Sequence, residues 1–170
     1  MHLVPTTQLQ SLLMPKQIEY KMANQIPDIL TLLPHRPPFL LVDEILSLSS
    51  DQVVTRTIFG NDHIFFEGHF PGEPVLPGVV LTEAMAQTIL ILHRYLYPST
   101  SPMYMASVQA KFLQPVFPNT AVVFTAEPVK FLKEKGIGKA QAAIGEKIVA
   151  TCKIGFGCPD IKIPMDDHQP

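Results

Sequence analysis

One histidine and one glutamate near the middle of the chain have the types and spacing needed for acid–base chemistry. His69 lies in the loop segment GHFPGEPVLP, and Glu83 follows it in a largely apolar stretch. An imidazole accepts a proton near neutral pH, and a carboxyl group in apolar surroundings is costly to ionise, so it can hold a proton. Together they could remove a proton beside a carbonyl group and protonate a departing β-hydroxyl group.

Gly78 adds a third group to this pair. It begins the predicted helix, so its backbone N–H lies at the positive end of the helix dipole and is suited to stabilise an enolate oxygen. Taken singly, each residue has an ordinary explanation: a hydrogen-bonded loop histidine, a glutamate near a helix start, a glycine after Pro77. Their combination on a proline-stiffened loop that leads into a buried helix predicts an elimination site.

The elements that must position these residues can be predicted from periodicity and turn residues. The segment from Gly78 to just before Pro98 is apolar almost all round, which predicts an enclosed helix. Gly60 to Pro77 is rich in proline and glycine and predicts an irregular loop. A short helix is expected at Asp28–Leu33, and turns at 133–136 and Gly145–Glu146. Strands are expected at 39–47, 52–59, 104–113, 121–132, 137–144 and 147–156.

The order of these elements decides the fold class. Two strands, one long helix and four strands do not alternate as a doubly wound parallel sheet requires. They predict an α+β hot-dog fold, in which a curved antiparallel sheet wraps around a long central apolar helix. We expect an N-terminal extension at 1–24, a hot-dog domain at 25–158 and a C-terminal tail at 159–170.

Composition narrows the classes of function. The chain of 170 residues has a net charge of -2 and no basic run, so it predicts no nucleic-acid partner. It has no apolar run long enough to span a membrane and no basic region before its short N-terminal apolar stretch, so we expect a cytoplasmic protein. Cys152 and Cys158 lack zinc-site spacing and are expected to be reduced structural thiols, with no metal bound.

Two motifs carry a resemblance to a known family. PHRPPFLLVDEI (34–45) and FFEGHFPGEPVLPGVVLTEAMAQ (65–87) strongly resemble the 3-hydroxyacyl-acyl carrier protein dehydratases of the FabZ type, and the likeness runs from about Ile26 to Phe156. The resemblance implies dehydration of 3-hydroxyacyl thioesters to trans-2-enoyl thioesters, without a cofactor. The pathway would be fatty acid synthesis or a related polyketide or specialised lipid synthesis.

The same resemblance implies roles for particular residues. His69 would be the base and Glu83 the acid, Gly78 would donate to the thioester carbonyl, Gln87 would orient the Glu83 carboxyl group, and Tyr104 would gate an acyl tunnel. The partner would be acyl carrier protein. The active unit would be a homodimer in which His69 of one subunit works with Glu83 of the other, and a trimer of dimers is common in the family.

Other readings remain open at this point. A hot-dog acyl thioesterase would also use a helix carboxylate, and a non-catalytic acyl-binding subunit would share the fold. Glu83 argues against the dehydratase-isomerase relatives, which carry Asp at the matching place. Pro37 and Asn119-Thr120 depart from the family pattern, which leaves acyl chain length and pathway open. His35, in the proline-rich loop, is expected to be structural.

Overall fold

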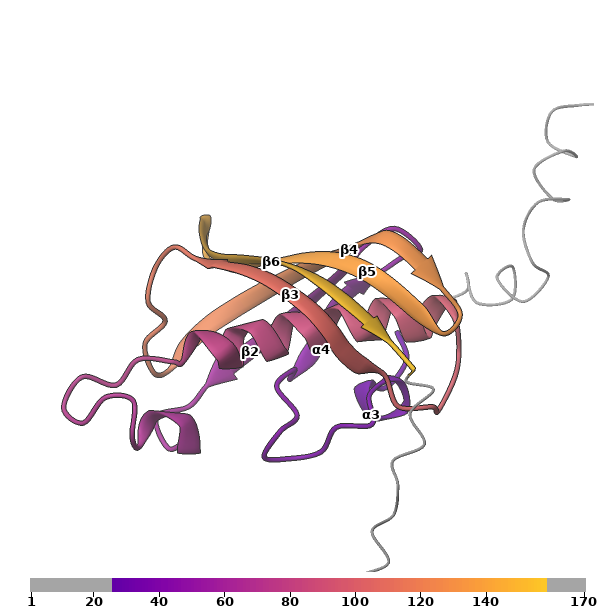
Figure 1. Cartoon of the computed structure of the whole chain (residues 1–170). Helices are drawn as coiled ribbons and strands as arrows, with labels where there is room; N and C mark the ends of the chain where they lie inside the picture. Colours follow the sequence, from indigo (N-terminus) through magenta and orange to yellow (C-terminus); the bar gives the residue numbers. More distant parts are fainter. Residues whose placement is uncertain (1–25, 159–170) are drawn as a thin grey trace, which may run out of the picture.

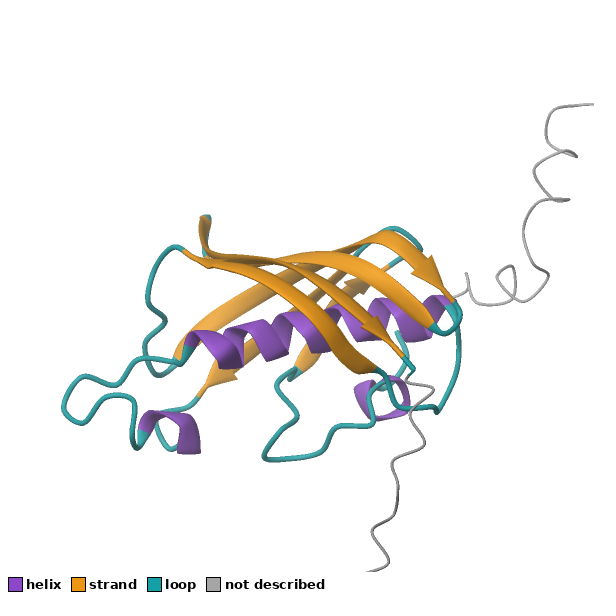
Figure 2. Cartoon of the chain, in the orientation of Figure 1, coloured by secondary structure: helices purple, strands orange, loops and turns teal. Residues whose placement is uncertain are grey.

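The computed structural model describes residues 26–158, so the predicted extension at 1–24 and tail at 159–170 lie outside the described residues. A six-stranded sheet curves around one long helix, α4, which runs along its concave side (Figures 1 and 2). The elements are α3 (Ile29–Leu32), β1 (Glu44–Leu48), β2 (Val53–Phe59), the 3-10 turn η1 (Ile64–Phe66), α4 (Gly78–Leu96), β3 (Tyr104–Phe112), β4 (Thr120–Leu132), β5 (Lys135–Ile144) and β6 (Lys147–Gly157).

The sheet has the strand order β1-β2-β4-β5-β6-β3, and every neighbouring pair is antiparallel. This arrangement confirms the predicted α+β hot-dog fold. The predicted turn at Gly145–Glu146 is also confirmed, with Gly145 at a φ of 58°. The predicted turn at 133–136 was too long, because Lys135 and Gly136 already pair with β4 and leave Lys133–Glu134 as the turn.

The core lies between the concave face of the sheet and α4. Val122, Phe124 and Ala126 alternate along β4 and are completely buried, as expected of a strand with one face on the core. The helix approaches β5 so closely that a Cβ on Gly138 would come within 2.5 Å of Cγ2 of Ile89. Only a glycine fits there, so this strand position sets how deeply α4 lies in the sheet.

The predicted strand at 39–47 starts later than expected. The β1–β2 ladder begins at Glu44, because the chain before it binds a side chain of α4 and is joined to β2 only by isolated hydrogen bonds of Leu41 and Asp43. The backbone groups of Phe39 and Leu41 form hydrogen bonds with the amide of Gln87. This segment therefore belongs to the surroundings of the candidate site.

β3 forms one edge of the sheet and pairs with β6. Its side chains are almost all exposed, including Tyr104, Met105, Val108 and Phe112. As for the helices between residues 26 and 158, none combines the length and apolarity needed to cross a lipid bilayer.

Candidate active site

His69 lies in a compact loop that closes on itself. Phe70 and Glu73 exchange backbone hydrogen bonds of 3.2 and 3.0 Å, and the Val75 N–H donates to the His69 carbonyl oxygen at 2.9 Å. The imidazole stacks on the Phe70 ring with centroids 4.0 Å apart. The loop is anchored to the rest of the fold where the Leu76 N–H donates to the Val116 carbonyl oxygen at 2.8 Å. These local bonds hold the imidazole in one orientation.

The loop also determines which nitrogen of neutral His69 can act as a base. Nδ1 lies 2.8 Å from the carbonyl oxygen of Val75. A carbonyl oxygen can only accept, so Nδ1 carries the hydrogen and Nε2 keeps its lone pair. Nε2 has no hydrogen-bond partner within the described part of the chain. The imidazole is therefore set up to accept a proton at Nε2.

Glu83 lies on the one stripe of α4 that the sheet does not cover. Val79, Glu83 and Ala86 follow helical spacing and are less buried than the residues between them. The Glu83 side chain is 22% exposed. An otherwise buried helix thus presents one carboxyl group that a second molecule or subunit can reach.

Gln87 holds that carboxyl group from the next turn of the helix. Its Nε2 donates to Oε1 of Glu83 at 2.9 Å and to the Phe39 carbonyl oxygen at 2.8 Å. Its Oε1 accepts from the Leu41 N–H at 2.8 Å. Gln87 is 1% exposed, so these bonds satisfy its buried amide. The predicted proximity of Gln87 to Glu83 is present, and the orienting role stays a prediction.

His35 also reaches Glu83, which the sequence did not suggest. Its Nε2 lies 3.6 Å from Oε1 of Glu83. Burial lowers the pKa of His35 below its ordinary value of 6.5, and the facing Glu83 partly offsets this effect. The imidazole is therefore largely neutral at pH 7. No spacing rule could have paired these residues, because the contact depends on how the loop at 34–39 crosses α4.

Gly78 begins α4, as predicted, and its N–H has no hydrogen-bond partner among residues 26–158. The ring of Phe112, at the end of β3, occupies the space beside it. A Cβ built on Gly78 would lie 2.9 Å from two ring carbons of Phe112. The absent side chain thus accommodates Phe112, while the N–H remains available to an acceptor.

Tyr104, the predicted tunnel gate, lies at the other end of β3 from Phe112. Eight steps of about 3.3 Å put some 26 Å of strand between the two residues. The Tyr104 side chain is 53% exposed. It therefore cannot gate a site at Gly78 of its own chain, and a gating role would have to be exerted on a site elsewhere in an assembly.

Within one chain, the two predicted catalytic groups are not bonded to each other. No hydrogen bond or ion pair joins His69 to Glu83 in the described segment; each is held by its own neighbours. Among residues 26–158, the structure thus provides one imidazole whose Nε2 has no partner and one carboxyl group whose Oε2 has none. It also provides a free N–H at a helix start, and these parts suit proton transfer once they are brought to one substrate.

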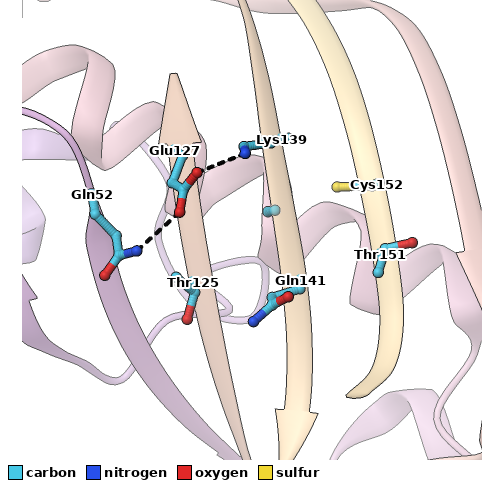
Figure 3. Close-up of a pocket in the computed structure, with 8 residues that line it drawn as sticks. Gln52, Thr125, Glu127, Lys139, Gln141, Thr151 and Cys152 are labelled. Atoms are coloured by element: carbon cyan, nitrogen blue, oxygen red, sulfur yellow. Dashed lines mark hydrogen bonds and ion pairs between the residues drawn. The ribbon is translucent and has the colours of Figure 1, made fainter. Parts of the chain in front are cut away.

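A shallow polar pocket of about 270 Å³ lies elsewhere, on the face of the sheet away from α4 (Figure 3). Here Glu127 accepts hydrogen bonds from Lys139 at 2.7 Å and Gln52 at 3.0 Å, which lower the pKa of its carboxyl group. None of the predicted site residues lines it. Over residues 26–158 there is also no cluster of three or more His, Cys, Asp or Glu side chains that would hold a metal ion.

Comparisons with known proteins agree on one family. The family model of the FabA-like domain matches residues 33–153. The chain is 37% identical over 137 residues to the 3-hydroxyacyl-acyl-carrier-protein dehydratase FabZ of Protochlamydia amoebophila, covering 79% of this chain and 89% of that protein. It is 38% identical to the FabZ dehydratase of Clostridium tetani over 135 residues, covering 77% and 94% of the two chains.

Solved structures show the same fold at low sequence identity. The dehydratase heterocomplex ApeI:P from Xenorhabdus doucetiae superposes with a TM-score of 0.69 at 16% identity, covering 80% of this chain and 93% of the other. An HP0420 homologue from Helicobacter felis superposes with a TM-score of 0.62 at 14% identity, covering 85% and 97%. At such identities the likeness establishes the fold and nothing about chemistry.

Proposed function

Since the chain belongs to the FabA-like domain family, we propose that it dehydrates 3-hydroxyacyl-acyl carrier protein, with His69 as the base and Glu83 as the acid. The observation that supports this reaction is the 37 to 38% identity to FabZ dehydratases over about nine-tenths of their length. The protein is therefore a hydro-lyase of fatty acid biosynthesis. The residue roles rest on the geometry of the two groups.

The chemistry follows from the free atoms of the site. Nε2 of His69 takes the C2 proton, and the electron pair of that C–H bond forms the C2–C3 double bond. The C3–O bond breaks, and Oε2 of Glu83 supplies a proton, so the hydroxyl group leaves as water. The Gly78 N–H donates to the thioester oxygen while it carries enolate charge. A proton then passes from His69 back to Glu83, so one turnover consumes none.

The shared site requires a second copy of the chain. A nine-residue edge strand with exposed apolar side chains, β3, is well suited to pair with a partner. Glu83 lies on the uncovered stripe of α4, where a partner's loop has access. We propose a homodimer in which His69 of one subunit faces Glu83 of the other. Tyr104, which is remote from Gly78 of its own chain, would gate an acyl tunnel formed between subunits.

One assay tests the reaction against its rivals. The protein is given a 3-hydroxybutyryl thioester of an acyl carrier protein, and 2-enoyl product and free thiol are followed separately. Enoyl formation without thiol release is expected. Thiol release would indicate a thioesterase, and binding without either product would indicate a non-catalytic acyl-binding subunit.

Mixing two inactive variants tests the shared site. His69→Ala and Glu83→Ala are each expected to be inactive, and co-refolding them should restore part of the activity, because mixed dimers contain one site with both groups intact. Light scattering on the same samples reports whether the assembly is a dimer or a trimer of dimers. No recovery despite proven subunit exchange would place both groups of a site in one chain.

A further inference from the structure

Glu83 has more polar neighbours than the stability of a carboxyl group on a helix requires. Two side chains, from different parts of the chain, direct nitrogen atoms at the same oxygen. Nε2 of Gln87 lies 2.9 Å from Oε1, and Nε2 of His35 lies 3.6 Å from it. Oε2 has no such partner among the described residues. The two oxygens of one carboxyl group are therefore chemically distinguished.

The loop that carries His35 is held at both ends. Arg36 donates to the carbonyl oxygens of Leu33 at 3.0 Å and His35 at 2.7 Å, and the Phe39 N–H donates to the Arg36 carbonyl oxygen at 2.9 Å. On the far side, Gln87 binds the Phe39 carbonyl oxygen. The imidazole is thus aimed at Glu83 by its loop, and the guanidinium group of Arg36 is turned to main-chain oxygens instead.

Stability alone does not explain an imidazole in this place. Nδ1 of His35 is buried and has no hydrogen-bond partner among the residues described. A buried polar atom without a partner is destabilising; Nδ1 of His63 and Nδ1 of His93 share this cost, but among the described residues only the His35 imidazole is paired with a carboxyl group. The distance of 3.6 Å is slightly beyond hydrogen-bond length, and such contacts in unliganded sites tighten when substrate binds.

We propose that His35 is a positioning residue for Glu83, which together with Gln87 engages Oε1 and so leaves Oε2 as the oxygen that carries the acidic proton. This inference rests on the proposed role of Glu83 as the acid. In a protonated carboxyl group, the carbonyl oxygen accepts hydrogen bonds and the hydroxyl oxygen donates. Two donors at Oε1 therefore make Oε2 the hydroxyl oxygen and point its proton toward the uncovered side of α4.

The neutral state of His35 suits this role. An imidazolium ion beside Glu83 would strongly favour the ionised carboxylate and so work against delivery of a proton. Burial lowers the pKa of His35, so at pH 7 it contributes an N–H dipole instead of a full charge. It can then orient the carboxyl group while leaving its proton available.

Three substitutions of His35 separate this role from others. His35→Gln keeps an N–H donor at a similar reach, His35→Asn keeps one that is too short to reach Glu83, and His35→Met has none. We expect Met and Asn to lower kcat roughly tenfold with KM nearly unchanged, the scale of one hydrogen bond in the transition state. Gln should stay within about twofold of the wild type. His63→Met, which removes another half-buried histidine, is the matched control and should be silent.

Each outcome decides the question. Wild-type kcat in His35→Met would overturn the inference, and equal loss in Gln and Met would show that the imidazole itself, not its donor, is required. If the His35→Met variant does not fold, the difference in kcat between His35→Gln and His35→Asn gives the same answer. Glu83→Gln is measured beside them: if it is active, the proposed role of Glu83 fails, whereas an inactive Glu83→Gln with a fully active His35→Met removes this inference alone.

Discussion

The two ends of α4 both bring ionisable side chains into the fold, and they use them differently. At the N-terminal end, Glu83 is partly exposed, and its neighbours Gln87 and His35 direct their nitrogens at one of its oxygens. At the C-terminal end, His93 and Arg94 are 0% and 3% exposed, and their bonds go to main-chain carbonyl oxygens. The N-terminal end thus leaves one carboxyl oxygen of Glu83 without a partner among the described residues, whereas the C-terminal end binds the main chain of neighbouring segments.

This difference follows from the partners of each group together with its burial. His93 binds the Leu132 carbonyl oxygen at 2.8 Å and is surrounded by the rings of Tyr97, Phe131 and Phe156. Arg94 binds the carbonyl oxygen of Ser101 and so holds the chain that follows α4. The other ring nitrogen of His93, Nδ1, has no hydrogen-bond partner among the described residues, as is also true of Nε2 of His69, but His93 is completely buried, so no substrate can reach it. The chemistry is therefore expected at the N-terminal end.

The largest effect should come from Glu83→Gln. The amide keeps the shape and the contact with Gln87 but has no acidic proton, so kcat should fall by about 100-fold or more. Glu127→Gln is the control, because Glu127 is also a hydrogen-bonded glutamate but lies on the opposite face of the sheet. Turnover of 3-hydroxyacyl-carrier protein measures both. Equal activity in the two variants would show that Glu83 does not supply the proton.

Gln87→Leu should affect both activity and stability. It removes one donor from Glu83 and leaves the buried Leu41 N–H without its partner, which costs about 1 to 3 kcal/mol of the free energy of unfolding. Activity should fall roughly tenfold, because an unrestrained carboxyl group spends less time in the reactive orientation. Urea unfolding and kcat are measured together, with the exposed Gln141→Leu as control. A stability loss without loss of activity would make Gln87 a purely structural residue.

The sequence predicted the framework of this site better than its contacts. Apolar alternation and the all-round apolar helix were sufficient for the sheet and for α4, because these patterns are local, whereas the partly exposed stripe that bears Glu83 was not predicted. The contact between His35 and Glu83 and the ring of Phe112 over Gly78 depend on segments far apart in the chain. The late start of β1 has the same origin, since its preceding residues bind Gln87. Periodicity carries no information about such crossings.

The buried His93 at the C-terminal end of α4 should make the free energy of unfolding depend on pH. Burial, the largest influence, lowers the pKa of His93 below its ordinary 6.5; the Leu132 carbonyl oxygen raises it and Arg94 lowers it. Below pH 6.5 the unfolded chain therefore takes up a proton at His93 that the folded chain resists. The free energy of unfolding should fall by up to about 1.4 kcal/mol for each pH unit below that value.

His93→Phe tests this assignment. It removes the titrating group and should flatten the decline in stability between pH 6.5 and 5, although it also loses the bond to Leu132 at every pH. The quantity to compare is the slope of unfolding free energy against pH, not its value at one pH. An unchanged slope would place the titration elsewhere. His35, whose pKa burial also lowers, should contribute a second, separable part.

The smallest effect is expected from modification of the two thiol groups, Cys152 and Cys158, which differ in how deeply they are buried. Burial raises the pKa of Cys152 to about 11, so at pH 7 only about one thiol in ten thousand is ionised. Cys158 is half-buried, and its sulfur has only long contacts, of 3.5 Å to the Pro102 carbonyl oxygen and 3.6 Å to the sulfur of Met103. N-ethylmaleimide should therefore label Cys158 and spare Cys152 in the folded protein.

The labelling also tests how closed the core between the sheet and α4 is. Because the contacts of Cys158 are weak, its modification should shift the melting temperature by only a degree or two, which mass spectrometry and thermal unfolding can establish on one sample. If Cys152 reacted as fast as Cys158 without unfolding, the sheet beneath α4 would have to open readily. Burial could then no longer account for the raised pKa of Cys152, and the contrast between a closed and an accessible thiol would be lost.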